Sequence, residues 1–346
     1  MSTPTPAGLL PDHWAELQAS GIAADVAALN VASFGPGTER HWETERGELV
    51  RHASRKIATE SRAGNGHAQG QAGHLSEALQ RLDRRYAHLS GGGWRSLSAE
   101  LEGVPRFDQW KPDQPRQKGK RDASGQWVPL LDQHGRPVPI KYEAPPKAPD
   151  GGGVMLPHVP ERCWRLICDR QRLPFPAPEV VAAGFWPWAL STPTLEVLPA
   201  EGIKKALAAI SAGYAALALP GVTMGVRRNP DASHRLIPAL AALSAGHRRS
   251  SCTLRRKGGK GRRWLIAFDA EAKASTAAKV GAAAGALARA LRAAGGRPRI
   301  ARLPLLSGTT KTGLDDLLAA QGADALADAL ATTGGRPVLP AQRAAD

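Results

Sequence analysis

The chain has 346 residues, with 46 Lys or Arg against 31 Asp or Glu and a formal net charge of +15. A balance this basic favours a polyanionic partner, for which nucleic acid is the simplest choice. Because the sequence holds no apolar run of about 18 residues, it excludes a helical membrane span, and we expect no membrane partner.

The first 34 residues predict a small helical unit. Apolar residues recur at helical spacing between Leu9 and Phe34, and Ser20-Gly21 marks a turn between two short helices. Such a unit could read DNA as a helix-turn-helix, although packing against the rest of the protein is the commoner use. The N-terminal residues have neither the basic region nor the apolar core of a signal peptide, so we expect a cytoplasmic protein.

A polar segment of poor periodicity follows over residues 35–74, and we interpret it as a linker or insertion. Its histidines lack the spacing of metal ligands and are interpreted as surface residues. They are His41, His52, His67 and His74. Apolar spacing then predicts a helix from Leu75 to Leu89.

Residues 75–190 form a basic, aromatic-rich N-terminal subdomain with irregular α+β character. Its aromatic residues, which are interleaved with Lys and Arg, include Trp94, Phe107, Trp110, Trp127 and Tyr142. Cations that meet phosphates and rings that stack on bases suit single-stranded DNA or RNA. The alternative, which is compatible with this one, is an irregular β-rich subdomain whose tryptophans form its core.

The end of this region predicts a helix around Cys163–Arg172 and then a Pro-broken apolar run, in which Trp186 and Trp188 are core residues. Cys163 and Cys168 have no second Cys or His pair at zinc-finger spacing. We therefore expect buried free thiols here rather than a zinc site.

Strands and helices alternate from residue 191 to residue 333. Apolar runs that suit strands are each followed by turn residues or by helical spacing. The runs are Leu195–Leu198, Ala215–Leu219, Trp264–Phe268 and Ile300–Leu303. This order predicts an α/β domain with a parallel sheet flanked by helices. Residues 334–346 are predicted to be a disordered tail.

Acidic residues follow several of these strands. Glu201 follows the first strand, Asp269 and Glu271 follow the third, and Asp315 and Asp316 head the last helix. Because the carboxyl ends of parallel strands share one edge of a sheet, we expect these side chains to converge there. Mg²⁺ or Mn²⁺ takes oxygen ligands, so the acids predict a metal site, although the helix dipole alone could explain Glu201.

Basic residues lie near the same predicted edge. Lys204 and Lys205 open the first helix of the α/β domain, Lys311 precedes the last helix, and we expect all three to contact phosphates. The run Arg248–Arg263 holds eight Lys or Arg and no acid. It includes Arg255, Arg256, Lys257 and Lys260. It suits either a solvated loop or a basic flap over bound phosphates.

Five short motifs resemble those of known proteins. Glu201-Gly202, Asp269-Ala270-Glu271 and Gly313-Leu314-Asp315-Asp316 are similar to motifs of the Toprim domain of bacterial primases, topoisomerases and small RNases. Lys111–Arg116 and Lys141–Pro145 resemble elements of a Toprim-like family of unknown function carried by plasmids and prophages. The resemblance implies a Toprim fold, metal-dependent nucleotidyl transfer, and a nucleic-acid or nucleotide side lined by residues that include Lys111, Arg116, Lys141 and Tyr142.

The resemblance is incomplete in three respects. Glu271 stands where the family pattern has Asp, which shifts an oxygen ligand by one methylene. The cysteines cannot form the zinc ribbon of a primase. We expect any replicative helicase that works with this chain to be a separate protein. Tyr86, Tyr142 and Tyr214 are the only tyrosines that could supply a topoisomerase nucleophile, and that class is disfavoured for so short a chain.

The leading hypothesis is a primase-like nucleotidyltransferase that uses nucleotides and single-stranded DNA or RNA in the replication of a mobile genetic element. Glu201 would be the acid or base beside Asp269, and the metal ligands would be Asp269, Glu271 and Asp315 or Asp316. Two alternatives stay open: a Toprim nuclease that cuts DNA or RNA, and a catalytically weak nucleic-acid-binding replication accessory protein.

Overall fold

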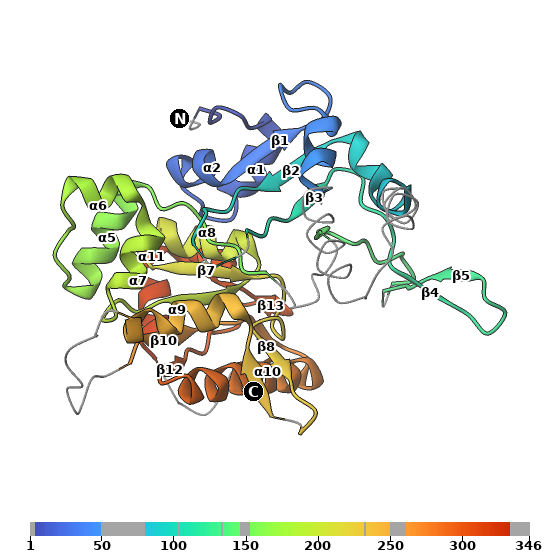
Figure 1. The fold of residues 1–346 in the computed structure, drawn as a ribbon. Coiled ribbons are helices and arrows are strands. Elements are labelled where there is room, and N and C mark those ends of the chain that lie inside the picture. Colours follow the sequence, from blue (N-terminus) through green and yellow to red (C-terminus); the bar gives the residue numbers. More distant parts are fainter. Residues whose placement is uncertain are drawn as a thin grey trace, which may run out of the picture.

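The computed structural model describes residues 4–49 and 80–332, with gaps at 103, 105, 133, 146–152, 232 and 250–260. These residues form a mixed α/β protein in which helices surround several small sheets (Figure 1). The prediction of a mixed α/β fold is therefore confirmed. The predicted tail, and the linker beyond residue 49, lie outside the described residues.

The first helices follow the prediction, but the helical unit ends earlier than expected. Helices α1 (Pro11–Gln18) and α2 (Ala24–Asn30) are joined at the predicted turn. Val31–Phe34 then forms strand β1, which pairs antiparallel with β2 (Gly93–Ser96). A strand whose partner lies so far along the chain leaves no local signal, since four buried residues suit a helix end equally well.

The rest of the N-terminal region packs around this sheet. Strand β3 (Trp110–Pro112) pairs antiparallel with β2. Residues 42–49 form a helix where a linker is predicted, and residues 80–86 are helical and continue into the 3-10 helix η1 (Ala87–Gly91). A buried cluster of Phe34, Leu49, Leu82, Tyr86, Leu89 and Trp110 holds these elements together.

A two-stranded ribbon projects from the N-terminal region (Figure 1). It consists of β4 (Gly119–Arg121) and β5 (Trp127–Pro129), which pair antiparallel. The predicted core function of the tryptophans is confirmed for Trp94 and Trp110, which are fully buried. Trp127 differs from them because 53% of its surface is exposed.

Three helices connect the two halves of the chain, and the first of them corresponds to the helix that the sequence predicts around Cys163–Arg172. They are α5 (Glu161–Gln171), α6 (Pro178–Ala183) and α7 (Phe185–Ser191). Trp186 and Trp188 are buried, and Cys163 and Cys168 are buried free thiols, so both predictions are confirmed.

Four parallel strands form the centre of the second half. Strand β6 (Leu198–Glu201) pairs with β7 (Ala216–Leu219), and β10 (Arg263–Ile266) pairs with β12 (Arg297–Ile300), both in parallel. Parallel bridges Val197–Trp264 and Ala200–Ala267 link the two pairs, so β6 and β10 are neighbours.

The remaining elements surround these strands. The helices are α8 (Ile203–Ser211), α9 (Pro238–Arg249), α10 (Ala274–Ala293) and α11 (Leu314–Ala331). Two short antiparallel pairs complete the set: β8 (Val226–Arg228) with β9 (His234–Leu236), and β11 (Ala270–Glu271) with β13 (Lys311–Thr312). None of the described helices combines the length and the apolarity that a membrane span requires.

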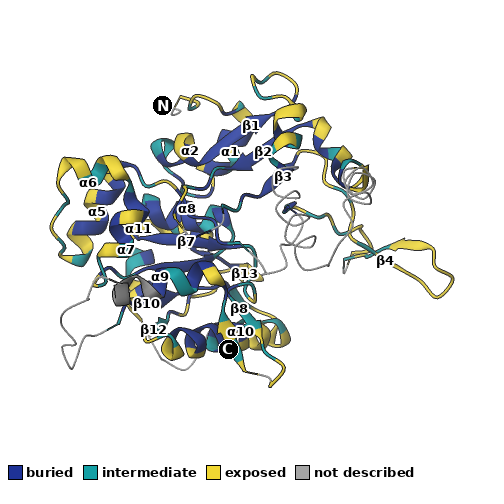
Figure 2. Ribbon diagram, in the orientation of Figure 1, coloured by how far each residue is buried: buried dark blue, intermediate teal, exposed yellow. Residues whose placement is uncertain are grey.

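Residues of the parallel strands alternate between two buried clusters, as side chains on opposite faces of a strand must. Leu198, Ala216 and Leu265 join the cluster that includes α8, α11, α1 and α2. Leu217 and Ile266 join the cluster that includes α5, α7, α9 and α10. Both faces of the strands are therefore buried (Figure 2).

Arg262, the residue before β10, is a buried hydrogen-bonding centre. Its guanidinium donates to the carbonyl oxygens of Ala189 at 2.5 Å, Leu195 at 3.2 Å and Leu243 at 3.1 Å. It also donates to the carbonyl of Thr192 at 3.3 Å. Burial lowers the pKa of Arg262 to about 10, so the group stays protonated at neutral pH. Arg262 therefore ties the end of α7 and α9 to the first parallel strands.

Candidate functional site

Two strand ends bring the first acids together. Glu201 is the last residue of β6, and Gly202 turns the chain into α8 with φ +85°, a left-handed value that glycine adopts readily. The Gly202 amide donates to the Leu219 carbonyl at 2.8 Å, which fixes this turn to β7. Asp269 follows β10, the parallel neighbour of β6, so both acids lie beyond the same edge.

Asp269 is the centre of an ion-pair cluster. Its side chain is fully buried, and its Oδ2 lies 2.6 Å from the Nζ of Lys311 and 3.3 Å from the Nζ of Lys205. Lys311 also lies 3.5 Å from Oε1 of Glu271, because β11 and β13 place these two residues opposite each other. The predicted neighbours Lys205, Glu271 and Lys311 are thus gathered around one carboxylate.

The two acids at the head of α11 have different positions. Asp315 is buried, and its Oδ1 would lie 2.5 Å from a Cβ placed on Gly313. Lys205 Cε lies 2.5 Å and Asp269 Oδ1 3.1 Å from the same position, so a side chain at 313 would have to displace these neighbouring groups. Asp316 is exposed, and its Oδ2 accepts a hydrogen bond from the Gly313 amide at 2.8 Å. Asp316 therefore caps the helix, and Asp315 faces Asp269.

Burial and charge shift the acids and the lysine of this cluster. Burial, and then the negative charge of Asp269, raises the pKa of Glu201 above its ordinary value. Burial also raises the pKa of Asp315, although Lys205 opposes this shift. Burial lowers the pKa of Lys311, but the contact with Asp269 outweighs it, so the net pKa is raised and the ammonium form is favoured.

The carboxylates fit a divalent cation in their chemistry. Among the described residues, Asp269 Oδ1 and Asp315 Oδ1 are buried and accept no hydrogen bond. Buried acceptors without a partner are costly, and Mg²⁺ bound by one or two carboxylates would satisfy them. The described residues include no group of three His, Cys, Asp or Glu that could hold a metal by itself. Water and a substrate phosphate would have to complete the coordination.

A second group of charges joins the N-terminal region to this site. Glu16 of α1 binds the Nζ of Lys111 at 2.5 Å and the Nζ of Lys204 at 3.1 Å. Burial raises the pKa of Glu16, but the two lysines outweigh it and the net pKa is lowered. Half-buried Tyr142 packs edge-on against Trp94, whose indole donates to Glu16. Glu16 thus joins α1 to Lys204 of α8 and to Lys111 of β3, and Tyr142 packs beside this group.

The other predicted basic residues lie elsewhere. Arg116 makes a two-point ion pair with Glu143, at 2.6 and 3.0 Å, which joins the segment before the ribbon to the segment after it. Lys141 is exposed. Arg255, Arg256, Lys257 and Lys260 lie outside the described residues.

Glu16 was not predicted from the sequence, and Gly313 was predicted only as part of the motif before the last helix, not for the space it leaves beside two carboxylates. Glu16 is 95 residues from Lys111 and 188 residues from Lys204, so no local pattern could connect them. A Ser–His–Asp set, in which His13 contacts Ser33 Oγ at 2.7 Å and Asp113 Oδ1 at 2.8 Å, was not predicted either. Ser33 is buried and its Oγ accepts a bond from the Leu10 amide, so this set joins α1 to β1 rather than presenting a nucleophile.

Replacing Glu201 by Gln is expected to stabilise the fold at neutral pH. In the folded protein, burial disfavours the charged form of the Glu201 carboxyl and raises its pKa. As the pH rises above the ordinary pKa of Glu, the unfolded chain loses this proton more readily than the folded chain does, so the folded state becomes less stable. The neutral amide avoids this cost, so we expect the melting temperature to rise by about 2 °C. The rise should vanish at about pH 4, where the carboxyl is largely protonated.

Thermal unfolding followed by circular dichroism at both pH values measures this effect. Glu179→Gln, at an exposed position of α6, is the matched control and should leave the melting temperature unchanged. A Glu201→Gln protein less stable than the wild type at neutral pH would contradict the raised pKa assigned to Glu201.

Comparison with known proteins gives two matches. The family model described as Domain of unknown function (DUF3854) matches residues 185–325, which include Glu201, Asp269 and Asp315. An uncharacterized protein of Picosynechococcus sp. (strain ATCC 27264 / PCC 7002 / PR-6) is 27% identical over 326 residues. The alignment covers 91% of this chain and 27% of that protein, so the chain spans about a quarter of this relative. No solved structure matches the chain.

Proposed function

We propose that this protein is a metal-dependent, primase-like nucleotidyltransferase that acts on nucleic acid in the replication of a mobile genetic element. One observation carries the proposal: Glu201, Asp269 and Asp315 gather with Lys205 and Lys311 beyond the ends of β6 and β10. The parallel pairing of β6 with β7 and of β10 with β12 supports a Toprim-like arrangement of this half.

Each residue of the site would have a separate role in phosphoryl transfer. Asp269 and Asp315, with Glu271 beside them, would hold Mg²⁺ or Mn²⁺. When bound, the cation would neutralise charge on the phosphate oxygens and orient them. Lys205 and Lys311 would contact the phosphates of the nucleotide, because their ammonium groups lie at the same edge. Glu201 would take the proton of the attacking hydroxyl, and its raised pKa suits a general base that works near neutral pH.

A nucleotide-incorporation assay tests the proposal directly. The purified chain is given a single-stranded template, labelled ribonucleotides or deoxyribonucleotides, and Mg²⁺ or Mn²⁺. We expect products that require the metal and that disappear in Glu201→Gln and Asp269→Asn. Synthesis that persists unchanged in both variants would contradict the proposal.

The same variants distinguish the alternative activities. A nuclease would cut labelled DNA or RNA in the absence of nucleotides and would lose that activity in both variants. An accessory protein would bind nucleic acid with strong salt dependence and show no metal-dependent turnover at all.

The ribbon of β4 and β5 supports a single-stranded nucleic acid as the partner. Its exposed cations include Lys118, Lys120 and Arg121. The indole of Trp127 lies against Gly119 of the paired strand, where any larger residue would collide with it. The indole is therefore held beside the backbone of the paired strand while much of the side chain is open to solvent, which suits stacking of a base on the ring.

Replacing Trp127 by Ala is expected to weaken binding of single-stranded DNA about tenfold, because stacking of one base contributes roughly 1–3 kcal/mol. Lys120→Gln should lower the slope of log affinity against log salt by about 0.7. Fluorescence anisotropy at several salt concentrations measures both effects. Leu131→Ala is the control, since Leu131 is an exposed apolar residue near the same ribbon. Equal losses in Trp127→Ala and Leu131→Ala would show that stacking is not involved.

A further inference from the structure

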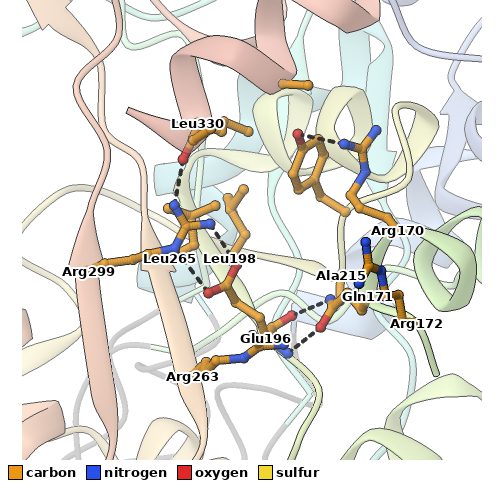
Figure 3. A pocket seen from close by; sticks show the side chains of 13 residues that line it. Arg170, Gln171, Arg172, Glu196, Leu198, Ala215, Arg263, Leu265, Arg299 and Leu330 are labelled. Atoms are coloured by element: carbon orange, nitrogen blue, oxygen red, sulfur yellow. Dashed lines mark hydrogen bonds and ion pairs between the residues drawn. The ribbon is translucent and has the colours of Figure 1, made fainter. Parts of the chain in front are cut away.

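A pocket of about 350 Å³ lies at the opposite end of the parallel strands from the acids (Figure 3). Its wall includes Leu198, the first residue of β6, and Arg263, the first residue of β10. The end of α5 and the last turns of α11 close its other sides. Glu201 and Asp269 lie beyond the far ends of the same strands, so the pocket is separate from the candidate functional site.

Positive charge dominates this pocket. Four arginines line it, and Glu196 is the one carboxylate among the lining residues. The arginines are Arg170, Arg172, Arg263 and Arg299. Arg299 makes a two-point ion pair with Glu196, at 2.8 and 3.0 Å, so that carboxylate is already neutralised. Among the described residues, no carboxylate forms an ion pair with the other three arginines.

The walls of the pocket are fixed before any ligand binds. Arg170 stacks on the Tyr214 ring at 4.3 Å from its centroid and donates to the Tyr214 hydroxyl and the Ala212 carbonyl. Arg299 also donates to the Leu330 carbonyl at 2.6 Å. The Gln171 side chain exchanges two hydrogen bonds with the Glu196 backbone. Figure 3 shows the bonds among the lining residues, with Arg170 and Arg172 on one side of the cavity and Arg263 and Arg299 on the other.

We propose that this pocket binds a small ligand carrying a di- or triphosphate group. Guanidinium forks match phosphate oxygens in geometry and charge, and three of them without a carboxylate partner around one pocket favour an anion of several charges. The volume lies within the range of small-ligand sites. The lining residues offer no pair of carboxylates and no exposed nucleophile, so the site binds its ligand without transforming it.

Isothermal titration calorimetry with inorganic triphosphate tests this site. EDTA is present, so that binding through a metal at Asp269 and Asp315 does not contribute. Arg172→Gln/Arg263→Gln is the informative variant, because both side chains are exposed and neither belongs to the buried core. Arg292→Gln removes one exposed positive charge on α10, outside the pocket, and serves as the control.

The wild type should bind triphosphate with a saturable isotherm, and the double variant should bind at least about tenfold more weakly. Arg292→Gln should change the affinity less than about twofold. Absence of saturable binding in the wild type, or equal affinity in the double variant, would overturn the proposal.

ATP and a single-stranded oligonucleotide distinguish a nucleotide from a nucleic-acid backbone as the source of the bound phosphates. ATP should compete with inorganic triphosphate for the wild type. If a single-stranded oligonucleotide loses affinity in the double variant while triphosphate does not, the arginines contact a nucleic-acid backbone and the proposal is wrong. The double variant leaves Glu201 and Asp269 in place. Failure of triphosphate binding at the pocket can therefore be distinguished from failure of the proposed nucleotidyl transfer, on which this inference does not depend.

Discussion

Asp315→Asn is expected to lower metal-dependent turnover by at least about 100-fold, while Asp316→Asn leaves it near the wild-type level. Residues that hydrogen-bond to metal ligands already contribute 10–100-fold to metal affinity or activity. Loss of a carboxylate that holds the metal should therefore lower turnover by at least as much. Asp315 is buried, and its Oδ1 shares with Asp269 Oδ1 the space beside Gly313. Asparagine at 315 would halve the negative charge that these two residues offer a cation.

The neighbouring residue makes an internal control. Asp316 uses one oxygen to accept the Gly313 amide bond, and Asn retains such an oxygen, so the helix cap survives the substitution. Both variants are measured for turnover as a function of Mg²⁺ or Mn²⁺ concentration, and circular dichroism verifies their folding. Equal activity in the two variants, or a greater loss in Asp316→Asn, would show that the acid facing Asp269 has been misassigned.

Arg262→Gln is expected to destabilise the protein by about 3 kcal/mol or more and to lower its melting temperature by about 10 °C. Arg262 is buried and donates to carbonyls of Ala189, Thr192, Leu195 and Leu243. Glutamine is too short to reach these oxygens together, and each buried acceptor that loses its partner costs about 1–3 kcal/mol.

Arg263→Gln provides the comparison for this prediction. Arg263 is exposed and its side chain donates a single bond, to the Thr194 carbonyl at 3.3 Å. Its replacement should change the free energy of unfolding by no more than about 0.5 kcal/mol. Urea unfolding of both variants measures the difference. If Arg262→Gln is as stable as Arg263→Gln, the carbonyl network does not stabilise the fold as described.

The sequence predicts some elements of the second half because their signals are local, whereas β8, β9 and α9 were not predicted. The helical spacing after Glu201 corresponds to α8, and the run Ala215–Leu219 to β7. The apolar run Ile300–Leu303 predicts the fourth strand, whereas β12 spans Arg297–Ile300. Arg297, Pro298 and Arg299 do not look like a strand by composition, and their pairing with Arg263–Leu265 of β10 decides the register.

The candidate site is predictable in its members but not in their contacts. Strand ends identify Glu201 and Asp269, and helix starts identify Asp315 and Asp316. Choosing between the last two depends on which carboxylate turns toward Gly313, a distinction that adjacent identical residues cannot reveal in sequence. The same holds for Lys204, whose ion pair with Glu16 exists only once the two halves have packed, and for Lys111, whose ion pair with Glu16 joins α1 to β3.

The bond from Lys204 to Glu16 has a consequence for biosynthesis. Its ends are 188 residues apart, as are those of the bond from the Ala23 amide to Ser211. Contacts of such long sequence separation form slowly, because a large loop must close before they contribute. Helices α1 and α2 therefore leave the ribosome well before α8, which packs against α2, is made. During that interval their apolar faces are uncovered, and we expect this stage of synthesis to be the one most prone to aggregation.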